Sequence, residues 1–146
     1  MRVVIQRVKE AQVRVAGQMI GQITRGMLIF LGVASDDSQG SADYLIKKIT
    51  ELRIFEDAQG KMNVSAQEAG AQYLVVSQFT LYGNCDKGRR PSFDQAADPV
   101  KGEELYDYFV KQLKAAKAVV ETGQFRAMMD VSLINDGPVT FIIDSK

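Results

Sequence analysis

The chain has 146 residues, of which 46% are hydrophobic and 25% are charged, and its 18 basic residues are balanced by 18 acidic ones. A chain of this length buries roughly 70% of its unfolded surface. We therefore expect a single domain, residues 1–146, with a hydrophobic core of its own. Zero net charge excludes a strongly basic protein that coats nucleic acid, although it allows a local basic patch.

Histidine is absent from the chain, and cysteine occurs once, as Cys85. These counts exclude a Ser-His-Asp triad, a Cys-His dyad and a metal site built from histidine or from several thiolates. We therefore expect no metal and no other cofactor. Any catalysis has to use hydroxyls, carboxylates, lysine, backbone dipoles or the substrate itself. Cys85 cannot form an intramolecular disulfide, and we interpret it as an unreactive thiol.

The N-terminal segment does not resemble a secretory signal peptide, because charged residues interrupt its apolar run. The longest apolar stretch, residues 27–34, is too short to cross a membrane. We therefore expect a cytoplasmic protein that does not contact a membrane.

The first half of the chain predicts strands followed by one helix. Alternating or continuous apolar character predicts strands at residues 3–8, 11–15, 19–23 and 27–31. From position 41 the apolar residues follow a helical period, and one helix face carries Ala42, Leu45, Ile46, Ile49 and Leu52. A short strand at 53–55 and a turn at 57–60 follow.

The second half predicts a buried strand at residues 73–81 and then a second helix. Asp98 followed by Pro99 is a typical helix start. Three further strands are predicted at 119–122, 129–134 and 139–143. Buried strands beside alternating ones predict a mixed α/β fold with three layers, in which two β-sheets pack together and the helices cover one outer face.

Polar residues interrupt the predicted strand at 73–81 near its end, where Ser77 and Phe79 alternate with Gln78 and Thr80. Buried polar side chains need hydrogen-bond partners or a cleft. One interpretation is a strand that leaves the core. The other is a cleft wall, in which Thr80 or a backbone N–H group meets a reacting carbonyl.

Two further segments have both a functional and a purely structural interpretation. Lys87, Arg89 and Arg90 precede an aromatic residue, a composition that suits phosphate contact and base stacking but is also common on solvated loops. Residues 135–140 read Asn-Asp-Gly-Pro-Val-Thr, which on its own predicts no more than a hairpin turn between two strands.

Taken together, these segments resemble the D-aminoacyl-tRNA deacylase family, also called D-tyrosyl-tRNA deacylases. The resemblance covers essentially the whole chain and rests on residues 1–8, 52–57, 60–63, 76–80, 87–93, 105–106 and 135–140. Each motif alone is weakly specific, whereas their joint order and spacing are very specific. The resemblance implies a homodimer with each active site at the subunit interface.

The resemblance also implies roles for particular residues. The catalytic segment comprises Ser77, Gln78, Phe79 and Thr80. Gly137 and Pro138 match a Gly-cisPro motif that enters the partner subunit's pocket and rejects L-substrates, and Arg7 matches a residue that holds this motif in place. The implied substrates are D-aminoacyl-tRNA and mischarged glycyl-tRNA, bound through the 3′-terminal adenosine.

Two alternatives stay open at this point. The ribose 2′-hydroxyl beside the ester can assist hydrolysis, because its position supplies effective molarity without a protein nucleophile. Thr80 can instead act as nucleophile or proton acceptor, although no base adjoins it in the sequence. The competing function is a non-catalytic RNA-binding module that uses Lys87, Arg89 and Arg90.

Overall fold

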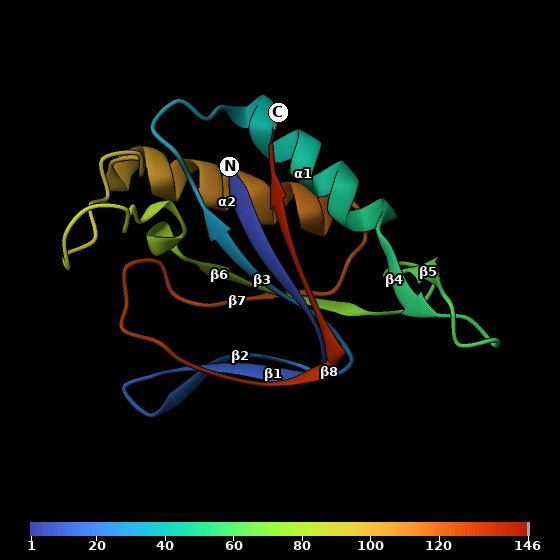
Figure 1. The fold of residues 1–146 in the computed structure, drawn as a ribbon. Helices are drawn as coiled ribbons and strands as arrows, with labels where there is room; N and C mark the ends of the chain where they lie inside the picture. Colours follow the sequence, from blue (N-terminus) through green and yellow to red (C-terminus); the bar gives the residue numbers. More distant parts are fainter. Residues whose placement is uncertain (146) are drawn as a thin grey trace.

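The computed structural model describes residues 1–145. Both α-helices lie on the same side of the main sheet (Figure 1). In chain order the elements are β1 (Arg2–Val15), β2 (Gln18–Ile23), β3 (Gly26–Gly32), α1 (Gln39–Glu51), β4 (Arg53–Glu56), β5 (Met62–Ser65), β6 (Gln72–Ser77), the 3₁₀ helix η1 (Phe79–Tyr82), α2 (Pro99–Ala115), β7 (Val120–Thr122) and β8 (Asp130–Asp144).

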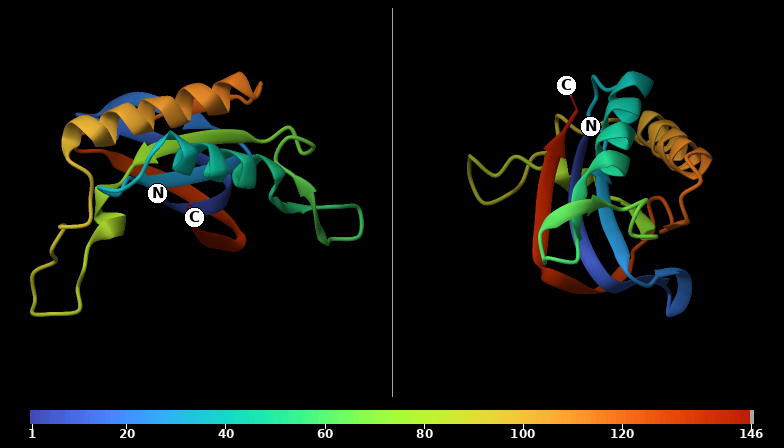
Figure 2. Two further views of the ribbon diagram at one scale, coloured as in Figure 1. Left: turned by 90° about the horizontal axis from the view of Figure 1, so that it is seen from above. Right: turned by 90° about the vertical axis from the view of Figure 1, so that its right-hand side faces the viewer.

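The long strand β1 is where the main sheet folds back on itself. The strands follow the order β2-β1-β3-β6-β7, and β8 pairs with β1 outside this path. The first half of β1 pairs with β3 and its second half with β2, while β8 runs beside both halves. The second half of β1, with β2 and the first half of β8 beside it, therefore passes beneath β3 and β6, as Figures 1 and 2 show.

Two hydrophobic cores separate the resulting three layers. The first lies between the helices and the sheet and includes Leu45 of α1, Phe109 of α2 and Val75 of β6. The second lies between the two parts of the sheet and includes Val13 of β1 and Leu74 of β6. The predicted mixed α/β fold is confirmed. Its two packed sheet layers are parts of one hydrogen-bonded sheet, and β4 and β5 form a separate two-stranded sheet.

The helices begin close to where the sequence predicts them. The Asp98 side chain accepts hydrogen bonds from the backbone N–H groups of Val100 and Lys101, which caps α2. Ser38 and Ser41 form a capping box at the start of α1. Within residues 1–145, no helix is long and apolar enough to span a membrane.

Two strand predictions need correction. Residues 73–81 do not form one strand, because β6 ends at Ser77 and η1 follows. The hairpin turn at 135–138 is also wrong, since β8 continues past it without reversing. Gln6 pairs with Thr140 and Val8 with Asn135, so residues 136–139 are extruded opposite Arg7 as a bulge in one ladder. We call residues 136–139 the β8 bulge.

The sequence did not predict β5. This strand has only four residues, of which two are polar, so it shows too short an alternation for a periodicity argument. The strands predicted at 3–8 and 11–15 are the single strand β1, because the exposed pair Lys9 and Glu10 stays extended.

Candidate active site

The predicted catalytic segment, residues 77–80, lies at the edge of the sheet where the parallel strands β3, β6 and β7 end. Carboxyl ends of parallel strands are a common place for ligand sites in α/β proteins. The N–H of Gln78 donates to the carbonyl of Leu31 at 2.8 Å, and the chain then turns into η1. This change from strand to helix exposes side chains that a continuous strand would place in the core.

The exposed groups of this segment are an aromatic ring and a small polar pair. Phe79 is 58% exposed, and its ring packs edge-on against Phe93 at 4.9 Å between centroids. The amide of Gln78 donates a hydrogen bond to the hydroxyl of Thr80. Phe79 and Thr80 open the 3₁₀ helix, so no carbonyl within η1 accepts from their N–H groups.

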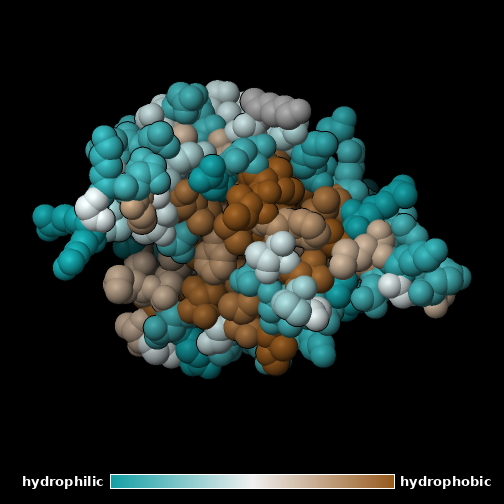
Figure 3. Space-filling view, viewed as in Figure 1, coloured by the Kyte–Doolittle hydropathy of each residue, from teal (hydrophilic) through white to brown (hydrophobic). Residues whose placement is uncertain are grey.

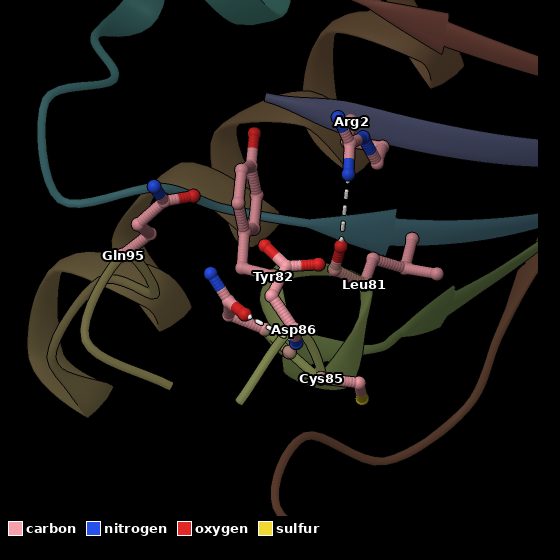
Figure 4. Close-up of a pocket in the computed structure, with 8 residues that line it drawn as sticks. Arg2, Leu81, Tyr82, Cys85, Asp86 and Gln95 are labelled. Atoms are coloured by element: carbon pink, nitrogen blue, oxygen red, sulfur yellow. Dashed lines mark hydrogen bonds between the residues drawn. The ribbon is translucent and has the colours of Figure 1, made fainter. Parts of the chain in front are cut away.

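A polar pocket of about 180 Å³ lies beyond η1 (Figure 4). Arg2 covers the ring of Tyr82 at 5.5 Å from its centroid and forms an ion pair with Asp144 at 2.7 Å. Burial raises the pKa of Tyr82 to about 12, so its phenol is uncharged at neutral pH. Cys85 also lines the pocket, as an exposed free thiol.

The predicted basic residues follow this pocket. Lys87, Arg89 and Arg90 are all exposed on the loop that projects from the sheet edge between η1 and α2 (Figure 2). Asn84 and Ser92 exchange backbone hydrogen bonds of 2.8 and 3.0 Å across the base of this loop. Among the ion pairs of residues 1–145, none involves these three cations, so their charges face solvent.

The β8 bulge has a fixed backbone. The Gly137–Pro138 peptide is cis, and Gly137 has a φ of +135°. A Cβ at Gly137 would lie 2.7 Å from Cγ2 of Val139, so no larger residue fits without movement. The Asn135 side chain accepts from the N–H of Val139 at 2.8 Å and donates to the hydroxyl of Thr140 at 3.0 Å.

Arg7 joins the bulge to β4. The residue is 4% exposed, and its guanidinium donates to the carbonyl of Asp136 at 3.1 Å and to the carbonyl of Ile54 at 2.6 Å. The carboxylates of Asp136 and Glu56 lie 3.3 and 3.5 Å away. These contacts offset the cost of burying a charge. Asn135 and Glu56 were not predicted as site residues, since only the folded structure brings them to the bulge and to Arg7.

One chain does not bring the catalytic segment and the bulge together. Arg7 pairs with Met27 and Met27 with Tyr73, so the bulge is level with the start of β6. Ser77 ends that strand, about 13 Å further on at about 3.3 Å per residue. Figure 1 shows the same separation, with η1 at the left end of the sheet and the bend of β8 at the right.

Possible metal ligands can be checked over residues 1–145. Among residues 1–145, no group of three or more histidine, cysteine, aspartate or glutamate side chains is placed to hold a metal ion.

Comparison with known proteins identifies the family. Residues 4–144 match the family described as D-Tyr-tRNA(Tyr) deacylase. Proteins named D-aminoacyl-tRNA deacylase from Desulfatibacillum aliphaticivorans and Bacillus mycoides are 57% and 55% identical over 146 residues, which is 100% of each chain.

Solved structures agree with this match. A structure titled c-Myc DNA Unwinding Element Binding Protein is 38% identical, with a TM-score of 0.95 over 100% of this chain and 99% of that chain. A second, titled as a probable eukaryotic D-amino acid tRNA deacylase, shares the fold at 20% identity, with a TM-score of 0.86 over 98% of both chains. The expected resemblance is confirmed, and the chain belongs to the D-Tyr-tRNA(Tyr) deacylase family.

Proposed function

We propose that this protein hydrolyses the ester bond of D-aminoacyl-tRNA in the cytoplasm, releasing free tRNA and the D-amino acid. The observation that carries the proposal is the match along the full chain to relatives named D-aminoacyl-tRNA deacylase at 57% and 55% identity. The exposed catalytic segment at the sheet edge supports it, because a bulky tRNA end needs an open site.

Each active site is completed by a second copy of the chain. The catalytic segment and the β8 bulge are both needed, and about 13 Å of strand separates them in one protomer. A homodimer allows the bulge of one protomer to approach the catalytic segment of its partner. The active site then lies at the interface and contains parts of both chains.

The exposed face of β1 and β8 supports this dimer. Val4 pairs with Phe30 on one side and with Ile142 on the other, and all three point away from the helices. Ile142 is 68% exposed, while Val4 and Phe30 are half-buried. Figure 3 shows hydrophobic side chains gathered in the middle of this face. An apolar surface of this kind is typical of a protein interface.

Chirality is selected by main-chain atoms. The carbonyl groups of Gly137 and Pro138 accept hydrogen bonds from the substrate's α-ammonium, which fixes the directions of the other groups on its Cα. A D side chain then points to open space, whereas an L side chain meets the backbone. Glycine has no side chain to reject, so glycyl-tRNA is also a substrate.

The ester is hydrolysed with help from the substrate. Water adds to the carbonyl carbon, and the ribose 3′-oxygen leaves with a proton that the neighbouring 2′-hydroxyl relays. The N–H of Phe79 stabilises the developing oxyanion, a contribution of about 2.7–4 kcal/mol for one such donor. Thr80 is a poor nucleophile here, since its oxygen already accepts a hydrogen bond from Gln78.

Lys87, Arg89 and Arg90 bind the phosphates near the 3′ end of the tRNA. Their exposure and lack of ion pairs among residues 1–145 leave their charges available. Replacing all three with glutamine is expected to raise KM and to reduce the salt dependence of tRNA binding.

The activity is tested by incubating the protein with D-Tyr-tRNA and L-Tyr-tRNA. We expect the D-ester to be hydrolysed at least a thousandfold faster than the L-ester. This ratio requires a difference of about 4 kcal/mol in transition-state binding, which one hard steric clash supplies. EDTA should not change the rate. Equal rates on both enantiomers would contradict the chiral filter, and binding without release of amino acid would favour the RNA-binding module.

The chemistry is tested with Thr80→Ala and with tRNA that ends in 2′-deoxyadenosine. The variant should lose less than about tenfold in rate, because it removes only one hydroxyl from a substrate-assisted reaction. The deoxy substrate should react far more slowly with the wild type. A dead variant together with a normal rate on the deoxy substrate would show that Thr80 is the nucleophile.

The shared site is tested with mixed dimers. One protomer carries Phe79→Pro, which removes the proposed oxyanion donor, and its partner carries Gly137→Ala. One of the two sites in such a heterodimer keeps both functional parts, so the isolated heterodimer should have about half of the wild-type activity, although each parent homodimer is inactive. No recovery, despite exchange of subunits, would mean that each chain forms its own site.

A further inference from the structure

The pocket beside η1 has no role in the function proposed above. Its wall combines the backbone of Leu81 with the side chains of Arg2, Tyr82, Asn84, Asp86 and Gln95 (Figure 4). At about 180 Å³ it lies below the 300–1,000 Å³ typical of pockets for drug-sized molecules. A single nucleic-acid base is a ligand of suitable size.

The position of the pocket matters as much as its size. Leu81 and Tyr82 directly follow Thr80 of the catalytic segment, and Asp86 directly precedes Lys87 of the basic loop. An RNA strand whose terminal adenosine reaches Thr80 and whose phosphates reach the basic loop has to pass this pocket. The nucleotide before the terminal adenosine is therefore the part of the strand that lies nearest to it.

The wall of the pocket includes an aromatic ring and a guanidinium group. The ring of Tyr82 is held by the guanidinium of Arg2, which also donates to the carbonyl of Leu81 at 3.2 Å. Single-stranded RNA is commonly bound by bases that stack on aromatic rings and on arginine planes. Because Tyr82 and Arg2 are fixed before RNA binds, little conformational freedom is lost on binding.

The polar groups of the pocket can pair with the Watson–Crick edge of cytosine. The backbone N–H of Asp86 donates to the side-chain oxygen of Asn84 at 2.8 Å, whereas the Asp86 carboxylate forms no ion pair within residues 1–145. Figure 4 shows this carboxylate directed toward Tyr82 and Leu81. It can accept from the 4-amino group of cytosine, and the amides of Asn84 and Gln95 can donate to the cytosine N3 and O2 acceptors.

We propose that this pocket binds the base of the cytidine that precedes the terminal adenosine of tRNA. The inference rests on the proposed function, since it takes aminoacyl-tRNA as the substrate. Uracil presents a carbonyl oxygen where cytosine presents its amino group, so the Asp86 carboxylate repels it. The pocket thereby checks the 3′ end of the RNA independently of the amino acid.

The test compares Asp86→Asn with the wild type on two substrates, D-Tyr-tRNA and D-tyrosyl-adenosine, which lacks the preceding nucleotide. We expect kcat/KM on the tRNA to fall about 5- to 150-fold, the range for one base-specific pair, while the rate on D-tyrosyl-adenosine stays unchanged. Replacing the cytidine with uridine should slow the wild type by a similar factor and slow Asp86→Asn little further.

The matched control is Asp94→Asn, which removes an exposed carboxylate of the same loop that does not line the pocket. It should leave both rates unchanged. An equal loss with both substrates would assign the pocket to the terminal nucleotide, and no loss with the tRNA would mean that the pocket is not used. Either result overturns the inference.

Failure of the proposed function gives a different result. In that case the wild type hydrolyses neither substrate. Equilibrium binding of uncharged RNA ending in CCA or CUA then decides the inference, because a cytidine pocket predicts tighter binding of CCA by the wild type and a smaller preference in Asp86→Asn. Equal affinity of the wild type for both ends would overturn the pocket as well.

Discussion

The catalytic segment and the β8 bulge are held in place in opposite ways. Phe79 and Thr80 are exposed, and the side-chain hydrogen bond within the catalytic segment joins two of its own residues. The bulge is fixed by the buried Arg7 and by the side chain of Asn135. The bulge is therefore held by contacts within one chain, whereas the predicted catalytic segment is open; in the proposed dimer it becomes enclosed when a partner and substrate bind.

This contrast fits the different tasks proposed for the two regions. A filter that separates mirror-image substrates has to hold its atoms within about 0.5 Å, so it gains from a rigid support. In the proposed mechanism the catalytic segment acts through backbone groups of a short helix and through the substrate's own hydroxyl. It needs correct placement of one N–H group more than a network of side chains.

The largest effect is expected at Phe79, where two substitutions distinguish the role of the backbone N–H group from that of the ring. Phe79→Pro removes the N–H group, and proline suits the first helical position. Phe79→Ala keeps the N–H and removes the ring. We expect Phe79→Pro to lower the single-turnover rate about 10²–10³-fold relative to Phe79→Ala, the effect of losing one oxyanion donor. Equal rates in the two folded variants would show that the ring, and not the N–H, matters.

The next effect tests whether the bulge has to be rigid. In Gly137→Ala the new Cβ collides with Val139 at 2.7 Å, and φ of +135° is unfavourable for alanine. We expect a loss of D-ester hydrolysis on the order of 100-fold, as for a 1 Å displacement in a site. Gly70→Ala is the control, because it also has positive φ, +62°, but its Cβ meets nothing within 4 Å. Similar losses in both variants would mean that backbone strain in general, and not the collision with Val139, lowers the activity.

Part of the fold and of the candidate site could be predicted from the sequence. The two helices, the buried strand before Ser77 and the family resemblance follow from apolar periodicity, the Asp98–Pro99 start and ordered motifs. The end of β6 could not be predicted, because alternation of polar and apolar residues continues through Thr80. The fold shows where the strand stops: the Leu31–Ser77 pair is the last of the ladder, and the N–H of Leu81 donates to the carbonyl of Gln78 in the turn that begins η1.

The bulge shows a different limit of sequence reasoning. Asn-Asp-Gly-Pro is a strong local turn signal, and local signals predict a chain reversal. The outcome is decided by β1, which pairs with β8 on both sides of residues 136–139. Long-range pairing therefore converts a predicted hairpin into a bulge. The contacts of Arg7 with Ile54 and Glu56 depend on the same long-range packing.

A smaller but still large effect is expected at Arg7. Arg7→Met keeps most of the buried volume but leaves the carbonyls of Ile54 and Asp136 without their donor. We expect unfolding free energy to fall by about 3 kcal/mol, the scale for breaking a buried charged contact. The ratio of D- to L-ester hydrolysis should fall as well. Arg14→Met is the control, because Arg14 donates to a backbone carbonyl in an exposed hairpin. A stable variant with unchanged discrimination would show that the bulge holds its shape without Arg7.

The smallest expected effect is that of Glu56→Gln. Glu56 lies 3.5 Å from Arg7, but its side chain is 54% exposed, so solvent and salt screen the pair. We expect a loss of less than about 1 kcal/mol in unfolding free energy, and the difference from wild type should disappear at high salt. The D-to-L ratio should stay unchanged, because the carbonyls of Ile54 and Asp136 still hold the guanidinium. Glu51→Gln, an exposed residue at the end of α1, controls for the loss of a surface charge. A loss of discrimination as large as that of Arg7→Met would mean that the Glu56 carboxylate, and not the two carbonyls, keeps Arg7 against the bulge.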